Sequence, residues 1–193
     1  NYLTAASKAA QALPAKSNAM IEGEDLKVIA NNAGETRVQE MSAFGNRWSG
    51  AKQLFWLADK TDGELKLELN VPETNEYILK ASYTKAPDYG IFQVEINGNK
   101  VGKPIDGFHG GVLKQDSIEI GRIELKKGKS ELAFKINGTN PKSNPKRYMI
   151  GIDFIELIPV KELAKPNLAA QTPATTEDLD PKQLQKWTAA LQV

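Results

Sequence analysis

Apolar and polar residues alternate in the middle of this 193-residue chain. In residues 91–96 the apolar side chains of Phe92, Val94 and Ile96 fall on one face of an extended strand, and the intervening residues fall on the other. Residues 77–84 form another run rich in β-branched and aromatic residues, which favour strands. The pattern predicts antiparallel sheet with one buried face, and such a sheet needs a second layer to cover it.

Similar short runs recur along the chain and are separated by turn dipeptides such as Asp62-Gly63 and Asn97-Gly98. No helical periodicity interrupts them. The predicted strands span residues 20–24, 26–30, 37–41, 53–57, 65–69, 77–84, 91–96, 117–125, 131–136 and 149–158. Ten short strands joined by turns predict an all-β fold, a β-sandwich.

Both ends of the chain have a different pattern. Apolar residues recur at helical spacing in residues 2–13, and Asp180-Pro181 is a typical helix start that precedes an amphipathic run. We therefore expect a helical extension over residues 1–18, a sandwich domain over residues 19–160, and a linker with a short helix over residues 161–193. We interpret the terminal helices as parts of a neighbouring domain into which the sandwich is inserted.

Composition excludes several classes of function. The 25 basic and 24 acidic residues nearly balance and form no basic tract, so nothing indicates binding to nucleic acid or an anionic membrane. Cysteine is absent, which excludes disulfides and zinc–thiolate sites. No apolar run approaches the roughly 18 residues of a membrane span. The sequence shows no signal peptide, so we expect a segment of a longer protein.

Catalytic motifs are also missing. His109 is the one histidine, no serine lies in a Gly-x-Ser-x-Gly elbow, and no glycine-rich phosphate loop follows a strand. A glycosidase would need two carboxylates in one cleft, which a sequence does not reveal. The chain is therefore predicted not to be an enzyme, with a glycosidase fragment as a remaining alternative.

Three acidic residues have unusual surroundings. Glu22 and Glu24 are two residues apart in a predicted strand, so both carboxylates project from one face and repel each other unless a cation lies between them. Asp153 interrupts an apolar run, and a buried carboxylate needs a partner. Together they offer the oxygen ligands that calcium prefers. Alternatively, solvent or an arginine, Arg37 or Arg147, neutralises these carboxylates.

The order of four motifs resembles carbohydrate-binding modules of the galactose-binding-like jelly-roll type, notably families 6 and 35. These motifs are Ile-Glu-Gly-Glu-Asp at residues 21–25, Glu-Tyr-Ile-Leu at 76–79, Ile-Asn-Gly at 96–98 and Gly-Ile-Asp-Phe-Ile-Glu-Leu at 151–157. Residues 48–56 and 84–90 also resemble a domain attached to bacterial polysaccharide-degrading enzymes and to planctomycete-like cytochrome-associated proteins. The resemblance implies a jelly roll with a structural calcium ion held by Glu22, Glu24 and Asp153.

The resemblance also directs attention to aromatic residues in predicted loops. Trp48, Tyr89 and His109 lie beside glycine and charged residues, where a flat ring can stack on a sugar and polar neighbours can bind its hydroxyls. The alternative is that these rings anchor the loops. Further sugar-binding candidates are Gln53, Trp56, Lys85, Asp88, Asn140 and Asn144.

We therefore expect a non-catalytic carbohydrate-binding module that targets a larger exported protein, extracellular, periplasmic or on the cell surface, to polysaccharide. The alternative is a structural or protein-interaction sandwich without a glycan site. Such a sandwich would pack against the catalytic or redox domain of its parent protein.

Overall fold

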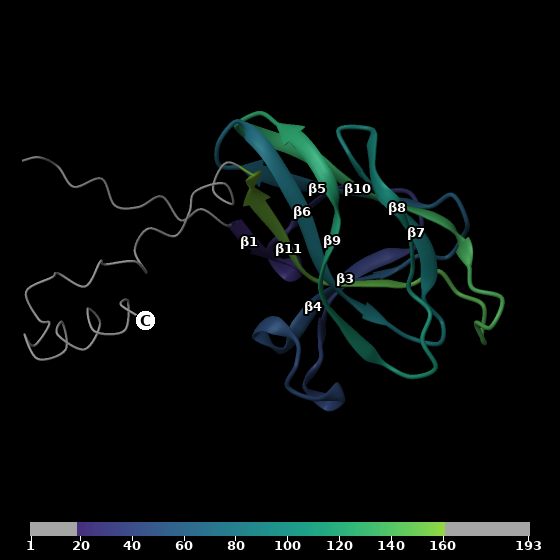
Figure 1. Ribbon diagram of the computed structural model, residues 1–193. Helices are drawn as coiled ribbons and strands as arrows, with labels where there is room; N and C mark the ends of the chain where they lie inside the picture. Colours follow the sequence, from purple (N-terminus) through teal and green to yellow (C-terminus); the bar gives the residue numbers. More distant parts are fainter. Residues whose placement is uncertain (1–18, 161–193) are drawn as a thin grey trace, which may run out of the picture. The chain divides into compact units, whose positions relative to one another are not determined.

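A computed structural model describes residues 19–160, which form two packed antiparallel sheets (Figure 1). The first sheet, sheet A, has the strand order β3-β4-β11-β6-β9, with β1 also paired to β11; sheet B has the order β2-β5-β10-β7-β8. The strands are β1 (Ala19–Glu22), β2 (Lys27–Asn31), β3 (Glu35–Glu40), β4 (Lys52–Leu57), β5 (Glu64–Val71), β6 (Asn75–Lys85), β7 (Gly90–Ile96), β8 (Asn99–Asp106), β9 (Leu113–Leu125), β10 (Gly128–Thr139) and β11 (Ile150–Pro159). The predicted all-β sandwich is confirmed.

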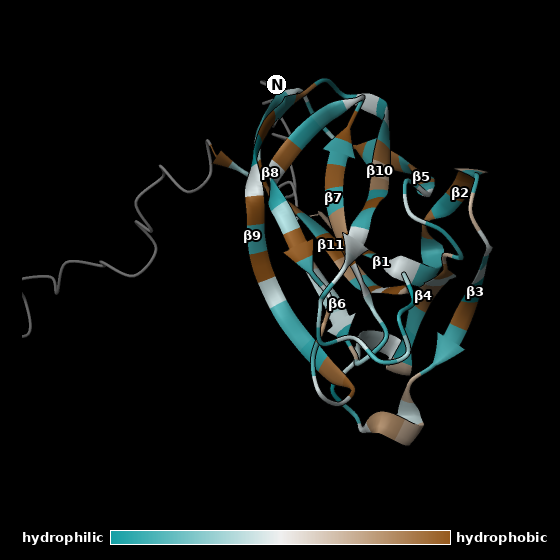
Figure 2. Cartoon of the chain, turned by 90° about the vertical axis from the view of Figure 1, so that its right-hand side faces the viewer, coloured by the Kyte–Doolittle hydropathy of each residue, from teal (hydrophilic) through white to brown (hydrophobic). Residues whose placement is uncertain are grey.

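The hydrophobic core lies between the two sheets. Alternate side chains of most strands point into it, and Figure 2 shows the resulting apolar and polar bands along strands such as β9. The largest fully buried side chains include Trp56 and Tyr77 from sheet A and Phe92 and Phe134 from sheet B. Burial of this kind contributes about 25 cal/mol per Å² of apolar surface and is the main force that holds the layers together.

The sequence pattern missed one strand, β8. Asn97 takes a positive φ of 50°, as expected for the predicted hairpin turn, and β8 then returns antiparallel to β7. Its sequence, with Gly102, Lys103 and Pro104, lacks a strand pattern because β8 lies at the edge of sheet B, where proline and lysine are tolerated.

Two local expectations were wrong. The predicted strand at residues 20–24 ends at Glu22 and continues as a 3-10 turn, η1 (Gly23–Asp25), because buried Gly23 lies tightly against the backbone of β11 and bends the chain. The polar face of residues 91–96 is not wet. Gln93 and Glu95 are buried, and Gln93 donates hydrogen bonds to the carbonyls of Val94 and Val101.

Part of the outer face of sheet A, at the carboxyl end of β6 and the amino end of β11, lies under residues 41–51, which contain the 3-10 turns η2 (Ser42–Phe44) and η3 (Ser49–Ala51). Trp48 Nε1 donates to Thr84 Oγ1 on β6 at 2.8 Å, and the Ser49 amide donates to Asp153 Oδ1 on β11 at 2.9 Å. We call residues 41–51 the cover segment. Beside the cover segment, β6 and β11 therefore have buried side chains on both faces, such as Ser82, Thr84 and Asp153 on the outer face.

Both ends of the described part leave the sandwich at one place. Ala19 pairs with Leu157, and Pro159 is the last residue of β11. The predicted terminal helices lie outside the described residues. Among residues 19–160, no helix is long and apolar enough to cross a membrane.

A fragment of residues 19–160 should fold without the flanking segments, because the core cluster, all eleven strands and the cover segment lie within it. We expect a cooperative melt within a few degrees of that of the full chain, measured by circular dichroism. Aggregation or a lost transition in the fragment would show that the flanking segments belong to the core.

Candidate functional site

The loops at the amino-terminal end of β11 enclose a pocket of about 170 Å³, the loop pocket. Eight of its ten lining residues are apolar, and the ten are Gln39, Met41, Phe44, Phe55, Ala86, Pro87, Asp88, Tyr89, Val112 and Met149. Phe44 and Val112 are 48% and 42% exposed, so they form an open apolar rim. Asp88 pairs with Arg147 at 3.7 Å beside the pocket. The predicted residues Asp88 and Tyr89 thus meet here.

A chain of buried polar groups runs beneath the loop pocket. The Trp48 indole donates to Thr84, the Thr84 hydroxyl donates to Gln53 Oε1, and Gln53 Nε2 donates to Gln39 Oε1 at 2.7 Å. Gln53 is fully buried, so its amide is used by the protein. The chain fixes the cover segment on sheet A and satisfies groups that would otherwise be costly to bury.

Trp48 and Tyr89 are not exposed rings, contrary to the expectation for loop residues that stack on a sugar. Their side chains are 5% and 6% exposed. Tyr89 stacks on Phe55 with ring centroids 6.0 Å apart, and its burial raises the pKa of its hydroxyl while a hydrogen bond with Gln53 opposes that rise. The loop-anchoring alternative describes both rings, because each fills space between a loop and the outer face of sheet A.

Three other candidates do not line the loop pocket. Trp56 is fully buried in the core, where its indole donates to the Ala33 carbonyl at 2.7 Å. His109 is exposed, and its Nδ1 lies 2.9 Å from the Gly111 carbonyl within its own turn. Asn144 is exposed and precedes Pro145 through a cis peptide bond.

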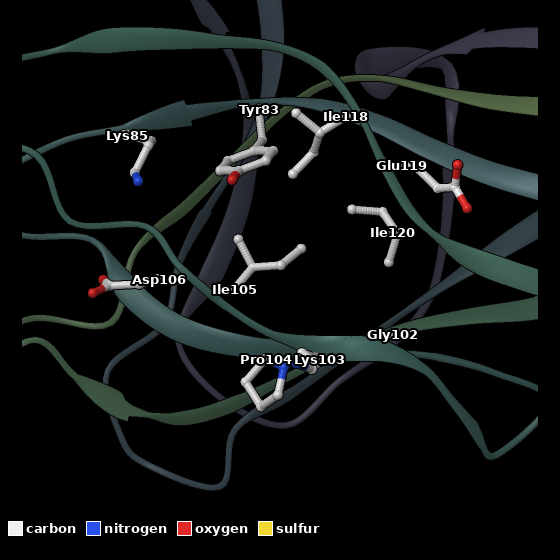
Figure 3. A pocket seen from close by; sticks show the side chains of 10 residues that line it. All are labelled: Tyr83, Lys85, Gly102, Lys103, Pro104, Ile105, Asp106, Ile118, Glu119 and Ile120. Carbon is white, nitrogen blue, oxygen red and sulfur yellow. The ribbon is translucent and has the colours of Figure 1, made fainter.

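A second and larger cavity, the edge cleft, lies between β8 and β9, the edge strands of the two sheets (Figure 3). It encloses about 570 Å³, within the usual range for small-molecule sites. At one point the two strands touch, because Gly102 has a φ of +64° and any Cβ there would lie 1.9 Å from the Ile120 carbonyl oxygen. The lining residues are Tyr83, Lys85, Gly102, Lys103, Pro104, Ile105, Asp106, Ile118, Glu119 and Ile120.

The edge cleft combines an apolar wall with charged groups. Ile105, Ile118 and Ile120 line its middle, and Figure 3 places the predicted Lys85 and the unpredicted Asp106 together toward one end. Isoleucine and charged residues of this kind form no recognisable motif in the sequence. They form a site only because two edge strands bring them together in the fold.

Asp106 is held in a fixed orientation. Its Oδ1 accepts the Phe108 amide at 2.9 Å, and its Oδ2 accepts the side-chain amide of the predicted residue Asn140. Burial, and secondly the charge of Asp106, raises the pKa of Tyr83, so that hydroxyl remains a protonated donor at neutral pH. Asn140 therefore positions a carboxylate of the cleft.

The acidic residues Glu22, Glu24 and Asp153 gather under the cover segment, and we call them the acidic cluster. Glu22 Oε1 accepts the Ser49 hydroxyl at 2.6 Å, while Glu22 Oε2 and Glu24 Oε2 are buried without a hydrogen-bond partner. Burial raises the pKa of Glu24, and the charges of Glu22, Asp25 and Asp153 add to this rise against an opposing backbone hydrogen bond. Negative charge is thus in excess here.

Lys114 supplies a positive charge to Asp153, and neither Arg37 nor Arg147 does so. Its Nζ lies 2.9 Å from Asp153 Oδ2, and the Ser82 hydroxyl donates to the same oxygen. Arg37 lies over the Phe55 ring and Arg147 pairs with Asp88. No sequence pattern indicated Lys114, because it lies 39 residues before Asp153 in the chain.

The acidic cluster fits calcium in the chemistry of its donors. All its side-chain ligands are oxygens, and two of them lack partners. Within residues 19–160, however, no three acidic or histidine side chains are arranged closely enough to hold a metal ion by themselves. An ion at this position would use the free oxygens of Glu22 and Glu24 together with other oxygens of the chain.

No protein-family model matches this chain. No curated protein matches it either. Among solved structures, it is similar to a part of xanthan lyase from Paenibacillus, with 25% identity and a TM-score of 0.64 over 72% of this chain. The chain spans only 13% of the length of that lyase.

Two further solved structures align less closely. A family 35 carbohydrate binding module from Clostridium thermocellum has 13% identity and a TM-score of 0.46, over 73% of this chain and 97% of that module. The Podospora anserina GH26-CBM35 β-(1,4)-mannanase has 16% identity and a TM-score of 0.47, over 74% of this chain and 28% of the mannanase.

Replacing Glu24 with glutamine should stabilise the protein in the absence of divalent cations. The pKa of Glu24 is raised on folding, so its ionised form costs stability, and that cost grows as the pH rises from about 4.5 through the raised value. We expect a small rise in Tm at pH 7 that disappears below the unfolded-state pKa of Glu24.

The matched control is Glu40→Gln, which changes an exposed glutamate and should leave the Tm unchanged. Thermal melts of both variants at several pH values, with chelator present, provide the measurement. A lower Tm for Glu24→Gln at neutral pH would mean that the charge of Glu24 is already neutralised.

Proposed function

We propose that the sandwich is a non-catalytic carbohydrate-binding module and that the edge cleft is its sugar site. The observation that carries the proposal is the pairing, in one cleft, of an apolar wall with polar groups held in place. Ile105 and Ile118 offer a surface for the C–H face of a sugar ring, and Lys85 and Asp106 offer a donor and an acceptor for its hydroxyls.

The binding groups are prepared before any ligand arrives. Asp106 is oriented by Phe108 and Asn140, and the Tyr83 side chain is buried with its hydroxyl protonated. A site that is already ordered loses little conformational entropy when it binds. This geometry favours selective recognition of hydroxyl groups, and no step of bond cleavage is needed from any residue of the cleft.

Similarity to part of a xanthan lyase supports a role beside a polysaccharide-acting protein. We propose that the module belongs to a larger exported protein and holds it on polysaccharide. Neighbouring domains of that protein would then be its partners, and they would carry any catalytic activity.

The loop pocket supports a second candidate function, docking of a protein. Its lining is mostly apolar, and Phe44 and Val112 expose apolar side chains. Sugar sites need more polar groups than this pocket offers, whereas a neighbouring domain could bury these side chains. The two functions use different surfaces and are therefore separable by mutation.

We also propose that the acidic cluster binds one structural calcium ion. The two unpartnered oxygens of Glu22 and Glu24 support this, because buried carboxylate oxygens without partners are costly. When bound, the ion would supply positive charge and would take part in no reaction. Glu22, Glu24 and Asp153 are the residues that would surround it.

Lys85→Met should weaken glycan binding by about tenfold, because a hydrogen bond from a charged donor contributes about 1.5–3 kcal/mol and part of it is recovered by water. Tyr83→Phe should weaken it by a smaller factor, since only one neutral donor is lost. The measurement is affinity for the tightest ligand in a panel of polysaccharides and oligosaccharides, with Tm recorded for each variant.

The controls are Lys52→Met and Tyr148→Phe, which change residues outside the cleft and should leave affinity unchanged. Phe44→Ala tests the loop pocket in the same assay. If Phe44→Ala abolishes glycan binding while Lys85→Met does not, the sugar site lies in the loops. A panel without any ligand would favour the protein-docking function.

Removal of calcium should lower the Tm. An ion that binds only the folded state stabilises it by RT ln(1 + [L]/Kd), about 2.7 kcal/mol at a hundred times Kd. Melts with calcium and with chelator, together with elemental analysis of the purified protein, test this. An identical melt in both conditions and no bound metal would contradict the calcium proposal.

A further inference from the structure

We propose that Lys114 is a resident cation of the acidic cluster, which holds the cover segment on sheet A when no metal ion is bound. The inference goes beyond sugar binding and assigns a positioning role to a residue outside both cavities. It uses the acidic cluster that is also proposed to bind calcium, but it holds whether or not that ion is bound.

Lys114 lies at the centre of contacts that join three parts of the chain, namely β9, β11 and the cover segment. Its ammonium group pairs with Asp153 on β11 at 2.9 Å and donates to the Arg47 carbonyl of the cover segment at 2.7 Å. It also lies 5.2 Å from the centroid of the Phe154 ring. The Lys114 side chain is 10% exposed and that of Asp153 is not exposed, so solvent screens this pair very little.

The cover segment depends on these charges for most of its polar attachment. Ser49 binds Asp153 through its amide and Glu22 through its hydroxyl, and Arg47 binds Lys114 through its carbonyl. All three contacts come from the acidic cluster or from its ammonium partner. Without a cation, three carboxylates would repel one another beneath the segment that they attach.

Charge counting gives Lys114 its distinct role. Glu22, Glu24 and Asp153 carry three negative charges if ionised, and Lys114 neutralises one of them. Of the three carboxylates, Lys114 contacts only that of Asp153, so the unpartnered oxygens of Glu22 and Glu24 remain available to a divalent ion. Lys114 thus attaches the segment permanently, and a bound ion would add to that attachment.

The position of the cover segment matters for function because its residues Met41 and Phe44 line the loop pocket. Trp48, in the same segment, is buried and hydrogen-bonded to Thr84, so its fluorescence reports whether the segment is in place. Trp48 is the reporter in the experiment that follows.

The experiment compares Lys114→Met with Lys52→Met in the full chain and in the presence of chelator. Lys52 is a matched control, because it adjoins the cover segment but forms an exposed pair with Glu40 at 3.8 Å. We expect Lys114→Met to lower the Tm by several degrees and to shift the Trp48 emission to longer wavelength, taken as the difference from the same protein with Trp48→Phe. Lys52→Met should change neither. Equal behaviour of the two variants would overturn the proposal.

Restoration experiments separate the charge of Lys114 from its packing. Lys114→Arg, or added calcium in Lys114→Met, should restore the Trp48 emission if a cation is what the segment needs. Calcium should also bind Lys114→Met about tenfold or more tightly than the unaltered protein, because a nearby positive charge is gone and Asp153 Oδ2 no longer pairs with an ammonium group. A residue needed only for packing would not raise calcium affinity.

The remaining outcomes distinguish the resident-cation proposal from the calcium proposal and from a packing role of Lys114. Restoration by arginine but not by calcium would support Lys114 as the resident cation and contradict the calcium proposal. Restoration by neither would mean that the aliphatic part of Lys114 acts by packing on Phe154, which overturns the inference. If Lys114→Met does not fold, the double variant with Asp153→Asn removes the unpaired buried carboxylate. That double variant should fold and still show displaced Trp48; an unchanged Trp48 emission there would overturn the inference.

Discussion

The contacts of the buried Asp153 carboxylate are the interaction on which the packing of the cover segment against sheet A depends. Asp153 lies in β11, between β4 or β1 on one side and β6 on the other, and it accepts hydrogen bonds from Ser49 and Ser82 and pairs with Lys114. A buried charge must be paired, because its transfer from water costs several kcal/mol. That requirement brings the cover segment, β6 and β9 together at one point and covers the part of the outer face of sheet A around Asp153.

Covering both faces of the central strands has a consequence for recognition. The rings that could have served as sugar platforms, Trp48 and Tyr89, are used to pack the loops against sheet A, and their polar atoms bind Thr84 and Gln53. The loop pocket that remains is mostly apolar. The polar side chains suited to bind a sugar lie instead in the edge cleft, at the side of the sandwich where β8 and β9 meet.

The edge cleft follows from the same two-layer construction. Each of the two sheets has two edge strands, and on one side of the sandwich the edge strands β8 and β9 meet where Gly102 permits their backbones to touch. Beyond that contact the edges enclose Tyr83, Ile105 and Asp106. Pro104 on β8 lacks a backbone donor and discourages the addition of a further strand, so the cleft is better suited to a compact ligand than to an extended peptide.

Local pattern was sufficient for the architecture. Alternation with a period of two identified most strands, and the Asn97-Gly98 turn was placed correctly, because side-chain direction and turn conformation depend on neighbouring residues alone. Local pattern failed at β8, whose edge position tolerates glycine and proline, and at Glu24, where close packing of Gly23 on β11 turns the chain out of the strand.

Site chemistry depended on distant neighbours. The sequence pattern identified Asp153 as a carboxylate that needs a partner. The partner, Lys114, is evident only from the sheet order, in which a single strand, β6, lies between β9 and β11, and Lys114 reaches across it. Trp48 and Tyr89 have the same sequence surroundings whether they stand open or lie under a loop. Burial is a property of the packed layers, and no local pattern of residues encodes which ring a distant strand will cover.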